Sequence, residues 1–139
     1  MGIKFYSDRE KKVINLELFA SDAETVAKKI YDSGKPNKNK ISQIRKFFDE
    51  ALKFDSYLKQ GEEYQAILPY IKMIHAKVKY AEGRNLVTPD FSGMIKDLIN
   101  QLDEKDPKSF EIFLSFFEAF MGYYKFFYES SYKERRINQ

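Results

Sequence analysis

The feature that most constrains the fold is a run of apolar, mostly aromatic side chains that recur at helical spacing from residue 110 to residue 128. A surface helix normally shows a single apolar stripe about 100° wide, yet two neighbouring lines are present here. The first line is Phe113, Phe117 and Tyr124, and the second line is Phe116, Phe120, Tyr123 and Phe127. Such a helix either packs on two sides within its own bundle or turns one line toward another protein. Both interpretations stay open, and the second line is the candidate protein interface.

The rest of the chain also shows helical periodicity. Predicted helices cover residues 21–33, 42–60, 62–82 and 94–102, and a fifth begins at residue 107. Ser21 and Glu24 form a capping box for the first helix, and Ser42 or Asn39 caps the second. Pro69 lies inside the third and would kink or split it, because proline removes a hydrogen bond and crowds the preceding turn. No strand-turn-strand pattern competes, so the sequence predicts an all-α, compact bundle of about five helices.

A chain of 139 residues is long enough for one core, so we expect a single helical-bundle domain over residues 21–139. Residues 1–20 are ambiguous, because VINLELFA fits either a strand or a short helix and follows the charged stretch SDREKK. We expect residues 1–20 to form a flexible N-terminal arm. The N-terminus is too charged for a signal peptide and no apolar run approaches a membrane span, so a cytoplasmic protein without membrane contact is the expectation.

Few residue patterns support catalysis or metal binding. The chain has no cysteine, and its one histidine, His75, lies at the edge of an apolar helix face, where a structural role is the usual one. The usual zinc and cysteine–histidine sites are therefore excluded, and isolated glycines form no phosphate-binding loop. We expect no catalytic residue, no metal and no cofactor. A small helical ribonuclease remains a third class of function, and it would need His75.

Residues 35–48, KPNKNKISQIRKFF, concentrate positive charge in a chain that is otherwise nearly balanced, with 24 basic and 21 acidic residues. No acidic residue occurs between Ser33 and Phe48. The segment leads into the N-terminus of a predicted helix, whose free N–H groups and dipole favour anions. An ordinary solvated loop is one explanation, and a phosphate-binding surface is the other. The candidate RNA-binding residues here are Lys38, Lys40, Gln43, Arg45 and Lys46.

A second basic group occurs late in the third predicted helix and consists of Lys72, Lys77, Lys79 and Arg84. It is weaker support for an anion site, because lysines near a helix C-terminus also stabilise the helix dipole. The sequence contains no motif that reads bases. Any nucleic-acid contact is therefore expected to involve the backbone, without sequence preference.

Three stretches of the sequence resemble one protein family. They are KNKISQIRKFFDEAL at residues 38–52, LPYIKMIHAKVKYAEGR at residues 68–84 and FLSFFEAFMGYYKFFYE at residues 113–129. Together they resemble the small subunit of the type III-A CRISPR interference complex, the Csm complex, over roughly residues 35–129. The Gln-Ile-Arg-Lys-Phe segment that follows the spaced lysines is the most specific part of this resemblance. Residues 1–20 show no such resemblance.

The resemblance implies a small helical protein without catalytic activity that works in antiviral defence. Such subunits self-associate, stack beside other subunits of the effector complex and contact the guide RNA–target RNA duplex through basic residues. Carried onto this sequence, Lys38, Lys40, Gln43, Arg45 and Lys46 would line the RNA side. Lys77, Arg84 and Lys125 would be further RNA contacts. Cleavage of target RNA would belong to other subunits.

Two main hypotheses follow for the function. The first is a non-catalytic RNA-binding subunit of a multi-protein effector complex. The alternative is a purely structural helical protein–protein adaptor, whose interfaces are apolar and whose lysines are merely solvated. The two differ in their dependence on ionic strength, because phosphate contacts weaken steeply with salt whereas apolar interfaces do not.

Overall fold

The computed structural model describes the backbone of residues 2–137 and the side chains of residues 2–131. Within that range the chain forms five α-helices: α1 (Ala23–Ser33), α2 (Ile41–Lys59), α3 (Tyr64–Gly83), α4 (Pro89–Asn100) and α5 (Lys108–Ile137). Before α1 come two short strands, β1 (Tyr6–Asp8) and β2 (Val13–Ile14), and a π-helical turn, η1 (Leu18–Asp22). The predicted all-α fold with five helices is confirmed.

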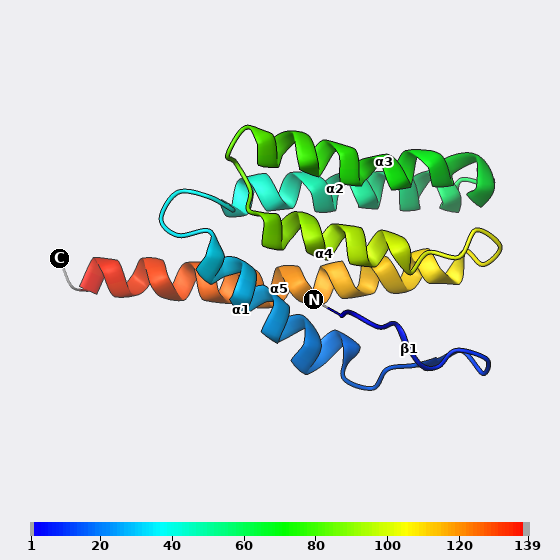
Figure 1. The fold of residues 1–139 in the computed structure, drawn as a ribbon, viewed down its shortest axis with the longest axis horizontal. Helices are drawn as coiled ribbons and strands as arrows, with labels where there is room; N and C mark the ends of the chain where they lie inside the picture. The colour runs from blue at the N-terminus through cyan, green and yellow to red at the C-terminus, as the bar shows by residue number, and fades with distance from the viewer. Residues whose placement is uncertain (1, 138–139) are drawn as a thin grey trace.

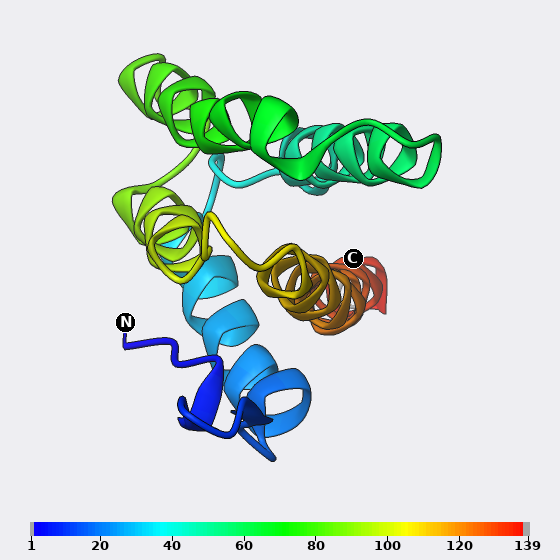
Figure 2. The same cartoon turned by 90° about the vertical axis from the view of Figure 1, so that its right-hand side faces the viewer.

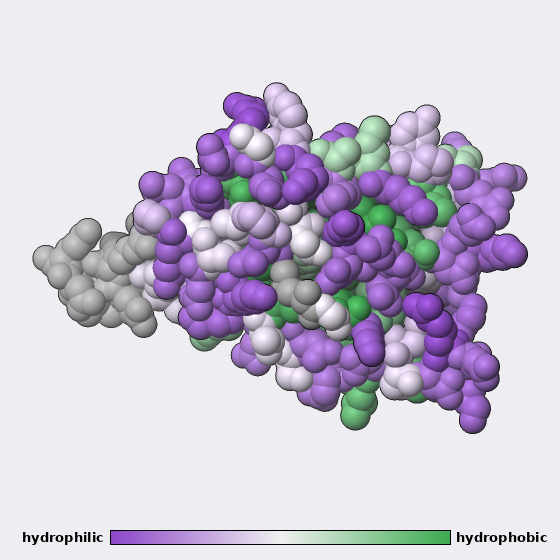
Figure 3. All heavy atoms as spheres, viewed as in Figure 1, coloured by the Kyte–Doolittle hydropathy of each residue, from purple (hydrophilic) through white to green (hydrophobic). Residues whose placement is uncertain are grey.

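The helices form a layered bundle (Figures 1 and 2). Helices α2 and α3 pair as one layer, and α4 and α5 lie beneath it. Helix α1 crosses the opposite side of α5, with the β1–β2 hairpin beyond it. The face seen in Figure 3 is mostly hydrophilic, and apolar residues show there only in small areas between polar side chains.

Helix α5 lies at the centre of the bundle because it packs on more than one side. Its buried aromatic residues meet neighbours on different helices: the Phe117 ring lies 5.1 Å from that of Phe48 on α2, and the Phe120 ring 6.4 Å from that of Phe91 on α4. Both lines of the sequence pattern therefore enter the core, which has a single connected set of buried side chains.

This arrangement corrects part of the candidate protein interface. Phe116 and Phe120 are 0% exposed, so the prediction that they face a partner is wrong. Their side of α5 is covered by the chain's own helices. Tyr123 and Phe127 are half-buried, and Phe126 is 64% exposed, the most of any aromatic side chain described on α5. An interface at Tyr123 and Phe127 stays a prediction.

Several helix boundaries differ from the sequence expectation. The capping box is absent: the Ser21 hydroxyl donates to Glu17 Oε1 at 2.7 Å, and α1 begins at Ala23. Helix α4 begins at Pro89, earlier than predicted, because proline fits the first helical position, where no N–H acceptor is needed. Helix α3 continues through Pro69 as one helix, so the proline does not split it.

Residues 2–20 pack against the bundle. Phe5 and Leu18 are completely buried, and the Phe5 N–H donates to Gln101 Oε1 at the end of α4. Lys12 forms an ion pair with Asp106 in the loop before α5. The boundary expected at residue 20 therefore does not separate an arm from the core. The flexibility of this segment stays a prediction that hydrogen exchange can measure.

Replacing Phe120 with alanine should lower the free energy of unfolding by about 3–5 kcal/mol, because it removes a fully buried ring from the centre of the bundle. Phe126→Ala on the same helix should change it by less than about 1 kcal/mol, since that ring is mostly exposed. Urea denaturation followed by circular dichroism measures both. Similar losses for the two variants would contradict the packing of α5.

Candidate nucleic-acid interface

The basic segment found in the sequence is the connection between α1 and α2, residues 34–40. It begins with a tight turn at Gly34, whose carbonyl accepts a hydrogen bond from the Lys38 N–H at 2.6 Å. A Cβ at Gly34 would lie 2.5 Å from Lys38 O and 2.8 Å from Asn39 Cβ, closer than such atoms can approach. Only glycine therefore allows the connection to fold back on the end of α1.

Asn39 fixes the other end of this connection. It is 1% exposed and has a left-handed backbone, with φ of 57°, which asparagine tolerates better than most residues. Its Nδ2 donates to Ile30 O at 3.0 Å and to Thr88 Oγ1 at 2.8 Å, and its Oδ1 accepts from the Thr88 N–H at 2.9 Å. One side chain thus joins the end of α1 to the α3–α4 loop.

The backbone of Asn39 adds two further links. Its N–H donates to Leu86 O at 3.0 Å, and its carbonyl accepts a hydrogen bond from the Tyr124 hydroxyl on α5. Burial raises the pKa of Tyr124 far above the ordinary value of 10, so the hydroxyl keeps the proton that it donates. We call this set of hydrogen bonds around Asn39 the Asn39 node. It ties the basic connection to α1, α5 and the α3–α4 loop.

The sequence analysis offered Asn39 or Ser42 as a helix cap, and both expectations are wrong. The N-cap of α2 is Lys40, and no side chain caps the helix. The side chain of Asn39 is instead used for the hydrogen bonds just described. Because no carboxylate or hydroxyl covers the first turn of α2, the positive end of its dipole faces the basic connection.

The exposed lysines lie on both sides of the buried Asn39, as Lys38 and Lys40. Within the part of the chain that the structure describes, Lys38, Lys40, Arg45 and Lys46 form no ion pair. Gln43, the uncharged member of the predicted set, is half-buried on the first turn of α2. We call Lys38, Lys40, Arg45 and Lys46 the unpaired cations of the site, because none of them forms an ion pair with a described residue.

Three other cations near this end, Lys28, Lys35 and Lys125, form ion pairs. Lys35 Nζ lies 3.6 Å from Asp32 Oδ1, which also accepts from Lys28 Nζ at 3.0 Å. The Lys28 ammonium, and to a smaller extent that of Lys35, hold the pKa of Asp32 below its ordinary value of 3.8. Lys125 Nζ lies 3.9 Å from Glu129 Oε1 on the same face of α5. These pairs are exposed and individually weak.

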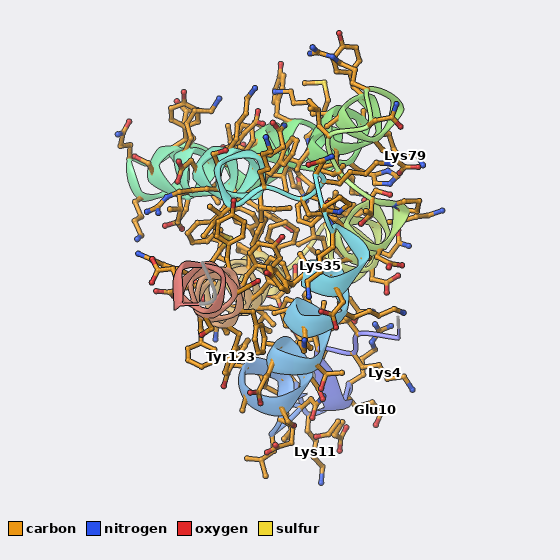
Figure 4. The ribbon with its side chains drawn as sticks, turned by 90° about the vertical axis from the view of Figure 1, so that its left-hand side faces the viewer. Lys4, Glu10, Lys11, Lys35, Lys79 and Tyr123 are labelled. Atoms are coloured by element: carbon orange, nitrogen blue, oxygen red, sulfur yellow. The ribbon has the colours of Figure 1, made fainter. Side chains whose placement is uncertain are left out.

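The structure brings most of the predicted RNA-binding residues to one end of the bundle. A groove between α2 and α5 is lined by Ile41, Ser42, Arg45, Lys125, Tyr128 and Glu129. It adjoins a cavity of about 210 Å³ that Lys38, Lys40 and Tyr128 also line. Figure 4 views this end of the molecule, with Lys35 between α1, α2 and α5. Arg45 of α2 and Lys125 of α5, 80 positions apart in the sequence, thus share one surface with the loop lysines.

The two predicted residues of α3 belong less clearly to this surface. Lys77 forms an ion pair with Glu50 of α2, so an acid within the bundle balances its charge. The Arg84 guanidinium lies 5.8 Å from the centre of the Tyr80 ring and carries no ion pair within the described residues. Arg84 closes α3 at the end of the bundle that carries the basic connection. Lys77 lies two turns earlier.

Sequence reasoning missed two aromatic members of this surface, Tyr31 and Tyr128. Both are half-buried and line the cavity together with the loop. Tyr31 lies in the last turn of α1, three residues before Gly34. An aromatic residue beside an acid-free basic run was the signal available in the sequence. Tyr128 was read only as part of the apolar run.

A separate apolar groove occurs on the other side of α5, lined by Phe19, Glu24, Ala119, Gly122, Tyr123 and Phe126. Figure 4 shows Tyr123 on the side of α5 away from α2. Phe127 lies beside it, with Lys28 Nζ 5.7 Å from the centre of its ring. Of the candidate interface residues, Tyr123 and Phe127 are therefore near an accessible apolar surface.

Comparison with protein families gives one match. Residues 14–130 match the family described as Csm2 Type III-A. The chain belongs to that family. Comparisons with curated proteins and with solved structures gave no match.

The match begins before the resemblance noted in the sequence, which started near residue 35, so it includes α1 and η1. As a member of the Csm2 family, the chain is a small subunit of the type III-A Csm complex and assembles with other subunits of that complex. None of the helices in residues 2–137 combines the length and the apolarity that crossing a membrane requires.

His75 of this Csm2-family chain lies half-buried near the middle of α3 and lines neither the cavity nor the groove described above. Burial, and then the charges of Lys79 and Lys96, lower the pKa of His75 below its ordinary value of 6.5. The side chains described in residues 2–131 include no group of three His, Asp or Glu residues that could hold a metal ion. The histidine has the surroundings of a structural residue.

Replacing Asn39 with alanine should lower the free energy of unfolding by about 3–4 kcal/mol. It leaves buried groups of Thr88 and Ile30 without partners and puts alanine at a left-handed backbone position. The matched control is Asn85→Ala, because Asn85 has φ of 63° but is exposed, and it should cost only about 1 kcal/mol. Equal losses in chemical denaturation would show that the Asn39 node adds nothing beyond backbone strain.

Proposed function

We propose that the chain is a non-catalytic, RNA-binding small subunit of the type III-A effector complex that acts in antiviral defence in the cytoplasm. It holds the backbone of the guide RNA–target RNA duplex on the surface formed by the unpaired cations. It reads no base sequence through these contacts. Other subunits would supply target cleavage.

One observation carries this proposal: the unpaired cations are exposed, and two of them, Lys38 and Lys40, lie on a connection that the Asn39 node holds in place. Phosphate oxygens are satisfied by ammonium and guanidinium donors, and each neutralised phosphate releases condensed counterions. A flexible lysine loop would lose more conformational freedom on binding than one whose backbone is already held by buried hydrogen bonds. Because the backbone around Lys38 and Lys40 is already ordered, a phosphate can bind there with little further loss of conformational entropy.

The first turn of α2 adds to the same anion site. Its free N–H groups and its dipole act in the same direction as the lysines. These donors fit phosphate oxygens and carry no information about base identity. This chemistry supports binding to the RNA backbone without sequence preference.

We also propose that the apolar groove around Tyr123 and Phe126 contacts another subunit or a second copy of the chain. An exposed aromatic residue beside half-buried ones is typical of a surface that a partner covers. This groove and the basic surface lie on different sides of α5, so both can be occupied at once. A small subunit that stacks along an RNA duplex needs both kinds of surface.

The apolar groove also supports the alternative function, a helical adaptor without RNA affinity. In that case complexes with other subunits would survive high salt and the lysines would contribute nothing. Salt dependence separates the two functions. Only RNA binding predicts that affinity falls steeply as salt rises.

The purified full chain should bind a fluorescent 40-nucleotide RNA, single-stranded or paired, with affinity that falls as salt rises. If the four unpaired cations each neutralise one phosphate, the logarithm of the binding constant should fall with the logarithm of salt with a slope of about −3. Lys38→Glu/Lys40→Glu/Arg45→Glu should reduce that slope to about −1 and weaken binding at least a hundredfold. Fluorescence anisotropy measures both quantities.

The matched control is Lys53→Glu/Lys59→Glu/Lys105→Glu, which changes net charge equally in the second half of α2 and in the loop between α4 and α5. That loop lies at the opposite end of the bundle from the basic connection (Figure 1). It should weaken binding by only a few fold, through the general field of the molecule. Equal losses in the two triple variants would refute the assignment of the site. Absence of salt-dependent RNA binding by the unmodified chain would favour the adaptor.

A further inference from the structure

The cavity beside the basic connection has features that phosphate binding alone does not use. Tyr31, Tyr124 and Tyr128 line it together with residues 34–36 and 38–40. A site for phosphate groups needs donors and positive charge but no aromatic wall. Stacking of a base on an aromatic ring is the contact that such a wall adds.

The two half-buried rings form a corner. The rings of Tyr31 and Tyr128 are 6.3 Å apart at 79°, and the ring of Tyr128 continues a stack with Tyr124 at 6.5 Å and 28°. The Tyr124 hydroxyl is used by the Asn39 node, whereas those of Tyr31 and Tyr128 form no hydrogen bond with other described residues. Among the described residues, two hydroxyl groups and two rings thus line the corner, and Lys35 Nζ lies over the ring of Tyr31.

The lysines that line the cavity lie close to these tyrosine rings. Lys38 and Lys40 line it and are unpaired, and Lys35 Nζ lies 4.9 Å from the centre of the Tyr31 ring. A cation held over a ring shows that this ring face attracts positive charge and is open to an exposed side chain. A base that displaced Lys35 from the ring would leave its ammonium free for the adjoining phosphate.

The size of the cavity limits the ligand. At about 210 Å³ it is smaller than the roughly 300–1,000 Å³ of pockets that enclose a drug-sized molecule. One base with part of its sugar is the largest piece of RNA that such a space suits. A base within a duplex is stacked and paired, so only an unpaired nucleotide can enter.

We propose that this cavity takes the base of one unpaired nucleotide of the bound RNA, stacked against Tyr128 and Tyr31, while Lys38 and Lys40 hold the adjoining phosphate. Stacking tolerates any base, so the cavity recognises the unpaired state of a nucleotide rather than its identity. This inference rests on the proposed RNA-binding function and deepens it. The basic surface sets affinity for the backbone, and the cavity sets the register at which an unpaired nucleotide is placed.

The test compares two RNA duplexes that differ only by a single-nucleotide bulge carrying 2-aminopurine, at fixed salt. The full chain should bind the bulged duplex about tenfold more tightly and should quench the 2-aminopurine fluorescence on binding. Tyr128→Leu should remove both effects while it leaves the salt slope for the paired duplex unchanged, because it changes no charge. Tyr128→Phe keeps the ring and should keep both effects.

Two further variants keep the result interpretable. Ser131→Trp places bulk in the cavity without removing a ring from the tyrosine cluster, so it should abolish the bulge preference even if Tyr128→Leu fails to fold. Tyr70→Leu changes an exposed tyrosine on α3 and should have no effect. Thermal denaturation confirms that each variant is folded.

The outcomes separate this inference from the function on which it rests. Equal binding of the paired and bulged duplexes by the unmodified chain, without quenching, would overturn the nucleotide site and leave backbone binding intact. A bulge preference that survives both Tyr128→Leu and Ser131→Trp would also overturn it. Failure to bind either duplex would overturn both proposals together.

Discussion

The structure depends on the hydrogen bonds of one buried asparagine. Asn39 links the end of α1, the α3–α4 loop and the centre of α5, and its neighbours in the sequence are the exposed Lys38 and Lys40. A buried polar side chain is stable only when it is fully hydrogen-bonded, and here that requirement also determines where the lysines lie. The turn at Gly34 makes the arrangement possible by letting the connection fold back without a steric clash. Stability and presentation of charge therefore have the same physical origin.

This arrangement divides the molecule into surfaces with different chemistry. The end that carries the basic connection combines unpaired cations, a helix N-terminus and two half-buried tyrosines. Elsewhere several lysines of the described helices pair with an acid on the same helix, as in Lys59 with Asp55 and Lys79 with Glu82. Such pairs contribute little to stability and leave no net charge to attract RNA. The nearly balanced total charge thus hides one concentrated basic surface, and the apolar groove lies on the other side of α5 from it.

Sequence periodicity predicted the helices because each buries a repeating apolar face, and the acid-free run predicted the basic surface. Neither pattern predicted the features that depend on tertiary contacts. The sequence pattern could not show which of the two aromatic lines of α5 is buried. Only the positions of α2 and α4 show that Phe116 and Phe120 lie in the core. Asn39 was taken for a helix cap, since its partners Thr88 and Tyr124 are 49 and 85 positions away. Lys77 was predicted as an RNA contact, but its pairing with Glu50 of α2 cannot be read from local spacing.

The most direct test of the central claim is to map contacts within the assembled effector complex, where the RNA has its natural partners. Target RNA that carries 4-thiouridine at successive positions can be cross-linked by light, and mass spectrometry then identifies the modified peptides of this subunit. The account predicts cross-links within residues 31–46 and 124–131, the segments that the Asn39 node holds together. Cross-links confined to α3 or to the apolar groove, or none in this subunit, would contradict it.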